Sequence, residues 1–92
     1  MQIKYTIDAF TSLAQLINFI ESKNTPGAGI RWLDQYEKHL EKVLINASQK
    51  KICHNATFNR LNLQCIYYKD WIVAFSIQEN FILIEVLMQI SD

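Results

Sequence analysis

The sequence predicts an α+β fold in the order β-α-α-β-β-β, with a helical hairpin packed on a small antiparallel sheet. Two observations predict it. Apolar residues recur at helical spacing on both sides of a break at 23–29. The last third of the chain alternates like strands separated by two short turns. With 92 residues, half of them hydrophobic, the chain suits one domain and is too short for two, so we treat residues 1–92 as a single domain.

The first half predicts one strand and two helices. Residues 2–10 alternate imperfectly and are predicted to be a strand. Ser12 and Gln15 fit a helix-capping box, and large apolar residues at helical spacing follow over 13–20. A second helix is predicted to start within 26–30, flanked by Trp32 and Tyr36. Its expected apolar stripe consists of Ile30, Leu33, Leu40, Val43, Leu44 and Ala47.

The second half predicts three strands, at 61–68, 71–78 and 81–89, with turns at 69–70 and 79–80. Before them, 51–53 is predicted to be a short extended piece and 55–57 a turn. The strand at 81–89 is apolar on both faces except at Glu85, which predicts a central position in the sheet. The first strand must then join this sheet, and the helix pair must cover one of its faces.

The charges are distributed unevenly, although the net charge is zero. Residues 43–69 contain Lys50, Lys51, Arg60 and Lys69 and no acid, whereas 70–92 contain no lysine or arginine. An anionic partner is expected to bind the basic stretch. The alternative is that these are scattered solubilising charges, with Lys50 and Lys51 protecting a sheet edge from pairing with another chain.

Compartment and metal content are inferred from what the sequence lacks. It has neither a secretory leader nor a run of about 20 apolar residues, so we expect a cytoplasmic protein without a membrane span. Cys53 and Cys65 are then expected to be reduced, partly buried thiols. With His39 and His54 they invite a zinc interpretation, but their spacing fits no compact ligand pair, so we expect no metal and no cofactor.

The layout and segment lengths resemble the RelE/ParE superfamily of type II toxins over nearly the whole chain. Asn59-Arg60-Leu61 is similar to the family's R-x-L element, WIVAFSI at 71–77 to its Y-R-V-x-Y-x-V strand, and EVLMQ at 85–89 to its last strand. The resemblance implies a growth-inhibiting toxin, of the kind also linked to plasmid stabilization, that a cognate antitoxin neutralises. Its target would be mRNA on the ribosome or DNA gyrase.

The chain departs from the family's ribonucleases where their chemistry lies. Ile72 stands where the family often has arginine, Met88 stands where many members have histidine, and no tyrosine follows Tyr68. Attack by an RNA 2′-hydroxyl needs a proton acceptor, a proton donor and cations at the phosphate. These departures favour a toxin that acts by binding its target over one that cleaves RNA. If the chain is an enzyme, the resemblance implies a ribosome-dependent mRNA endoribonuclease.

The remaining candidate site residues lie in the basic stretch. His54 is a candidate general base, and Arg60 is a candidate catalytic residue through its place in R-x-L. Lys50, Lys51 and Arg60 are candidate phosphate contacts, although Arg60 equally suits a structural ion pair. The alternative function is a degenerate RelE/ParE-like module that binds only protein, including itself as a homodimer. Zero net charge favours that alternative, because RNA binders are usually basic.

Overall fold

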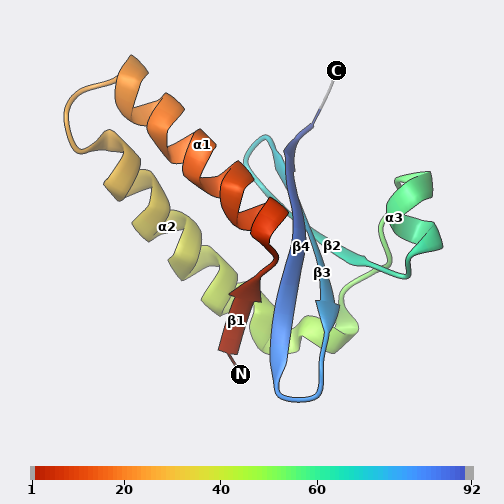
Figure 1. The fold of residues 1–92 in the computed structure, drawn as a ribbon. Coiled ribbons are helices and arrows are strands. Elements are labelled where there is room, and N and C mark those ends of the chain that lie inside the picture. Colours follow the sequence, from red (N-terminus) through yellow and green to blue (C-terminus); the bar gives the residue numbers. More distant parts are fainter. Residues whose placement is uncertain (1, 91–92) are drawn as a thin grey trace.

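A computed structural model describes residues 2–90. Its elements are β1 (Gln2–Tyr5), α1 (Ile7–Lys23), α2 (Ala28–Val43), the 3₁₀ helix η1 (Leu44–Gln49), α3 (Ala56–Arg60), β2 (Gln64–Tyr68), β3 (Trp71–Ile77) and β4 (Phe81–Gln89). The α1–α2 hairpin lies on one side of the sheet, and α3 lies on the other (Figure 1). The predicted fold class and helical hairpin are confirmed. No helix within 2–90 is long and apolar enough to cross a membrane.

The four strands form one mixed sheet in the order β1-β4-β3-β2. β1 runs parallel to β4, and the other two pairs are antiparallel. The predicted central position of the last strand is therefore confirmed. The β3–β4 register passes from Ala74↔Val86 to Phe75↔Ile84, so Glu85 is the extra residue of a β-bulge. The bulge accommodates the charged residue that interrupts this apolar strand.

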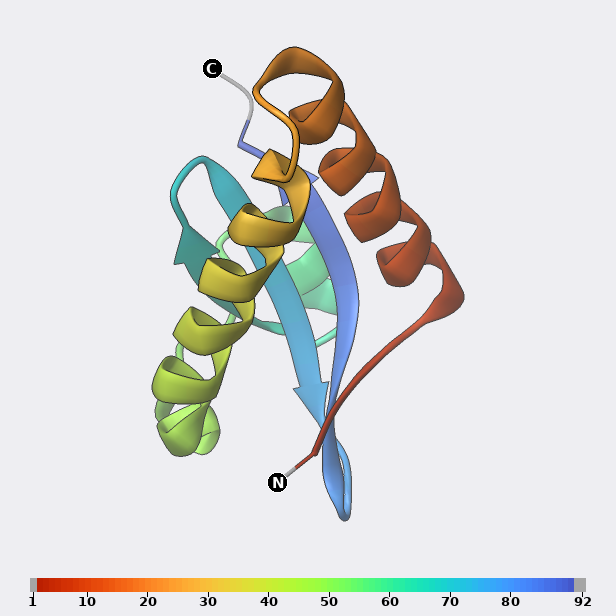
Figure 2. The same ribbon diagram turned by 90° about the vertical axis from the view of Figure 1, so that its left-hand side faces the viewer.

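The first strand is shorter than predicted, because a helix begins inside its predicted range. Thr6 ends β1 and caps α1: its hydroxyl accepts the Ala9 N–H at 3.1 Å. The Thr6 N–H also donates to the Ile84 carbonyl (3.0 Å), and the Thr6 hydroxyl donates to the Glu85 carbonyl (3.3 Å). The capping box predicted at Ser12 is wrong, since Ser12 lies within α1. Figure 2 shows the chain leaving the sheet here to enter α1.

The helical hairpin covers the sheet through a core that the predicted stripe describes only in part. Leu40 and Leu44 are buried as expected, but Ile30 is 67% exposed. Tyr36, predicted to flank the stripe, is fully buried and accepts a hydrogen bond from the Tyr5 hydroxyl at 3.2 Å. Burial raises the pKa of the Tyr36 phenol, so it stays protonated. Tyrosine reaches the core here because its hydroxyl has a partner.

The turn between the two helices is fixed by a carboxylate from α1. Gly27, the N-cap of α2, has a left-handed backbone (φ 88°) and offers no side chain to cap the helix. Instead, Glu21 accepts the Gly27 and Gly29 N–H groups at 2.8 and 2.9 Å. A Cβ on Gly29 would lie 2.8 Å from the Ile17 carbonyl, so only glycine allows this close approach of the helices.

The Glu21 cap predicts an acid-sensitive hairpin. The Gly27 and Gly29 N–H groups lower the pKa of the Glu21 carboxyl below its ordinary value. A folded-state pKa below the unfolded value contributes stability above the unfolded pKa, which is lost as pH falls through the folded pKa. We expect the unfolding free energy of wild type to fall more steeply than that of Glu21→Gln between about pH 5 and pH 3, measured by urea denaturation. An equal dependence of the unfolding free energy on pH in the two proteins would show that Glu21 does not stabilise the turn.

Candidate functional site

The candidate site lies on the sheet face opposite the helical hairpin. A second, small apolar cluster forms there from buried Cys53, Leu63 and Ala74, with Phe58 and Val86 partly buried against it. The segment from η1 to β2 crosses this face and includes α3 (Figure 1). The predicted turn at 55–57 is instead the start of α3, because the Asn55 side chain accepts the Thr57 and Phe58 N–H groups and caps a helix.

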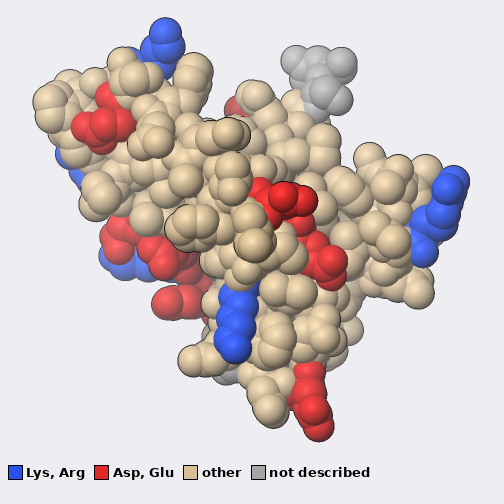
Figure 3. Space-filling model, in the orientation of Figure 1, with Lys and Arg blue, Asp and Glu red and all other residues tan. Residues whose placement is uncertain are grey.

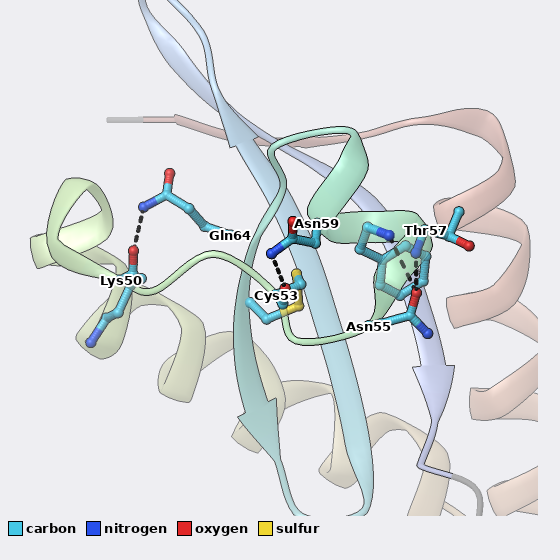
Figure 4. Close-up of a disulfide and its surroundings, with 8 residues drawn as sticks. Lys50, Cys53, Asn55, Thr57, Asn59 and Gln64 are labelled. Atoms are coloured by element: carbon cyan, nitrogen blue, oxygen red, sulfur yellow. Dashed lines mark hydrogen bonds between the residues drawn. A yellow bond between two sulfur atoms is a disulfide. The ribbon is translucent and has the colours of Figure 1, made fainter.

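A disulfide anchors this segment to the sheet. Cys53, which precedes α3, is bonded to Cys65 of β2, with their Cα atoms 5.0 Å apart (Figure 4). The expectation of two reduced thiols is therefore wrong for this structure. A short antiparallel bridge between Ile52 and Gln64 places the two cysteines side by side, which their spacing in the sequence does not reveal. Because the two cysteines are bonded to each other, their sulfurs are not available as zinc ligands in this structure.

Hydrogen bonds fix the backbone on both sides of the disulfide. The Cys53 N–H donates to the Leu63 carbonyl (2.9 Å), and the Cys65 N–H donates to the Lys51 carbonyl (3.1 Å). The Gln64 side-chain amide donates to the Lys50 carbonyl at 2.7 Å, a bond drawn in Figure 4. The backbone of the predicted phosphate-binding lysines is thus held against β2.

Three of the four predicted site residues surround one surface pocket. Its volume is about 330 Å³, and it is lined by Gln49, Lys50, Lys51, Ile52, Cys53, His54, Cys65 and Tyr67. Two lysines and a histidine therefore lie among the lining residues of a pocket that also includes Ile52 and the disulfide. Lysine side chains around such a pocket favour an anion.

Tyr67 is the site residue that the sequence reasoning missed. Its ring is 51% exposed and borders the pocket, where a nucleobase or another planar group could stack on it. Alternation along β2 gave a usable signal, because it put Tyr67 on the same face as Cys65.

Arg60 does not join this group. It is the last residue of α3, is exposed, and does not line the pocket. Figure 3 shows basic side-chain atoms over the outer end of α3. Arg60 therefore does not share the pocket with His54.

Met88 lies on the same sheet face as the pocket. The register places Tyr67 opposite Ile72 and Ile72 opposite Met88, so these three side chains form one row across β2, β3 and β4. Met88 is 37% exposed. Of the three residues in this row, Ile72 and Met88 have side chains that cannot transfer a proton.

The edge of β4 is only half paired. β1 covers it from Phe81 to Ile84 and ends where the chain turns into α1. No strand described within 2–90 pairs with β4 on that side from Val86 to Gln89. Two large apolar side chains of the adjoining first turns of α1, Ile7 (85%) and Phe10 (61%), are exposed. A strand edge beside an apolar helix end is a suitable place for an extended peptide to bind.

Comparison with solved structures gives a likeness that extends over nearly the whole chain. No protein-family model matches the sequence, and no curated protein matches it. Among solved structures, a chain described as "Chromosomal ParDE TA system from P. aeruginosa" superimposes with a TM-score of 0.77. The match covers 99% of this chain and 97% of that chain, with 12% identical residues. At that identity the likeness shows the fold, and it confirms the RelE/ParE-like fold.

The disulfide predicts a stability difference between the oxidised and reduced protein. The bond joins cysteines 12 positions apart, and closing a loop of this length restricts the unfolded chain by about 3 kcal/mol. We expect reductant to lower the free energy of unfolding by up to that amount, measured by urea denaturation followed by circular dichroism. The double variant Cys53→Ala/Cys65→Ala should be insensitive to reductant. Identical urea midpoints for wild type with and without reductant would show that the bond adds no stability.

Proposed function

We propose that this chain is the toxin of a type II toxin–antitoxin pair and that it inhibits growth by binding its target. The observation that carries the proposal is the whole-chain likeness to a chain of a ParDE system, at a TM-score of 0.77. That match covers 99% of this chain. Function is inferred from this likeness by analogy, so the surface features below are needed to support it.

The half-paired edge of β4 supports an antitoxin partner. Backbone N–H and C=O groups of a free strand edge take up an extended peptide through ladder hydrogen bonds. The exposed Ile7 and Phe10 side chains at the start of α1 would cover apolar residues of the same peptide. An antitoxin segment that adds a strand to Val86–Gln89 would therefore bury both features at once.

Action by binding is favoured over RNA cleavage by the row of Tyr67, Ile72 and Met88. Cleavage needs groups that transfer protons and stabilise charge at the scissile phosphate. On the last strand, the positions that would supply them hold Met88 and Gln89. Inhibition of DNA gyrase, the ParE-type activity, needs a binding surface and no such groups. We therefore propose gyrase as the target.

The second candidate is ribosome-dependent mRNA cleavage. One observation favours it: Lys50, Lys51, His54 and Tyr67 border the same pocket. In that mechanism the lysines would hold phosphate, His54 would act as general base, and a base would stack on Tyr67. Arg60 would contribute only a remote phosphate contact.

Expression of the chain alone in a bacterial host separates these functions. New DNA and new protein would be labelled separately while growth is followed. Under the proposal, growth stops and DNA synthesis falls first, and His54→Ala and Arg60→Ala remain as toxic as wild type. Early loss of protein synthesis that His54→Ala and Lys50→Ala/Lys51→Ala abolish would establish the ribonuclease instead. Lys42→Ala, an exposed lysine of α2, serves as the matched control.

Undisturbed growth with abundant soluble protein would reject both toxic mechanisms. The chain would then be a RelE/ParE-like module that binds only protein. Circular dichroism of each purified variant establishes that loss of toxicity does not reflect unfolding.

The antitoxin surface predicts a separate effect on neutralisation. Phe10→Lys places a charge beside the free edge of β4, so we expect the protein encoded next to the toxin to bind at least about ten-fold more weakly and to rescue growth poorly. Phe19→Lys is the matched control, because Phe19 lies on the same helix and is equally exposed, at 60% against 61%. Binding is measured by calorimetry with purified proteins. Equal loss in both variants would place the antitoxin elsewhere.

A further inference from the structure

The Cys53–Cys65 disulfide is a covalent cross-link between β2 and the segment that precedes α3. These are the only two cysteines of the chain. The protein therefore has only two intramolecular thiol states, a closed disulfide and an open dithiol. We expect a cytoplasmic protein from the sequence, and disulfides in that compartment are usually transient or redox-sensing.

Apart from the disulfide, little holds the loop of residues 52–63 on the sheet. Within α3, only Phe58 is partly buried, and the other four residues are exposed. The side-chain hydrogen bonds of the loop stay within it: Asn55 caps α3, and Asn59 donates to the Cys53 carbonyl at 3.1 Å. The remaining attachment consists of the small cluster of Cys53, Leu63 and Ala74, against which Phe58 and Val86 pack, and of the bridge between Ile52 and Gln64. Segments with so few buried contacts open at low free-energy cost.

The lysine-bearing part of the segment is held differently. The Gln64 amide donates to the Ala47 and Lys50 carbonyls at 2.9 and 2.7 Å, and the Cys65 N–H donates to the Lys51 carbonyl. None of these bonds requires the sulfur–sulfur bond. Opening the disulfide should therefore release residues 52–63 and leave Lys50 and Lys51 against β2.

The disulfide is accessible from solvent on one side. Both cysteines line the surface pocket, but Cys53 is 1% exposed whereas Cys65 is partly exposed on an edge strand. Cys65 is therefore the more accessible of the two cysteines to an incoming thiolate. Lys50, Lys51 and His54 border the same pocket, and cations favour both the thiolate and the carboxylates of glutathione.

We infer that Cys53–Cys65 is a thiol–disulfide exchange site that switches residues 52–63 between a docked and a released state. A glutathione thiolate attacks the Cys65 sulfur, the disulfide breaks, and Cys53 leaves as a thiolate that takes up a proton. A second glutathione thiolate attacks the mixed disulfide, which frees Cys65 and forms glutathione disulfide. Two electrons pass from two glutathione molecules to the protein, and glutathione disulfide reverses the reaction.

Release of residues 52–63 moves His54 out of the pocket, and the pocket also loses the disulfide that lines it. The two lysines remain, but they no longer border a formed site. The same change frees α3 and with it Arg60.

Trypsin provides a direct test, because Arg60 is its only cleavage site between the two cysteines. We expect cleavage after Arg60 to be at least about ten-fold faster in the glutathione-reduced protein than in the disulfide form, quantified by mass spectrometry after final reduction. The variant Cys53→Ala/Cys65→Ala should be cut fast in either buffer. Equal rates for the two redox forms of wild type would overturn the inference. So would simultaneous acceleration at Lys23 and Lys38, which would indicate global unfolding rather than local release.

A glutathione titration tests whether the exchange operates as a switch. Purified protein is equilibrated in buffers whose ratio of reduced to oxidised glutathione spans the cytosolic and secretory compartments, and free thiols are trapped by alkylation. We expect the dithiol fraction to change across this range. A pair that stays oxidised throughout would be a permanent structural bond, and a pair that stays reduced would never dock the loop. Either result refutes the switch, and neither depends on whether the chain inhibits growth.

Discussion

The structure depends on the junction at which β1 ends on β4 and α1 begins. Thr6 makes three connections there: its N–H bonds to Ile84, its hydroxyl reaches the carbonyl of the bulge residue Glu85, and the same hydroxyl caps α1. Capping satisfies backbone donors that a helix otherwise leaves without partners. One residue thus fixes the end of the parallel strand, the start of the helix and the position of both on the central strand.

That junction also determines which surface remains available to a partner. Because the chain turns away at Thr6, the edge of β4 beyond Ile84 has no neighbouring strand in the part of the chain described. The same turn leaves Ile7 and Phe10 exposed beside the edge. The geometry that completes the fold therefore leaves this strand edge unpaired, and the proposed antitoxin contact rests on that edge.

The opposite sheet face combines two kinds of surface with different stability. The row of Tyr67, Ile72 and Met88 lies on paired strands. The neighbouring pocket depends on a loop with few buried contacts and on one disulfide. Chemistry at that pocket would depend on the redox state of the protein, whereas binding through the strands or the β4 edge would not. The redox state would therefore control contacts at the pocket without changing contacts at the strands or at the β4 edge.

The sequence by itself determined the fold class, the helical hairpin, the central last strand and the basic character of residues 43–69, because these follow from local periodicity and charge. It did not determine where β1 ends, since alternation continues through residues 7–10 while the capping bond of Thr6 and the bulge at Glu85 decide the boundary. Tyr36 was placed at the flank because periodicity does not show that Tyr5 offers its hydroxyl a partner. Only the tertiary structure brought Cys53 to Cys65, because the bridge between Ile52 and Gln64 joins segments that sequence spacing alone does not pair. It also placed His54 at the pocket and Arg60 outside it.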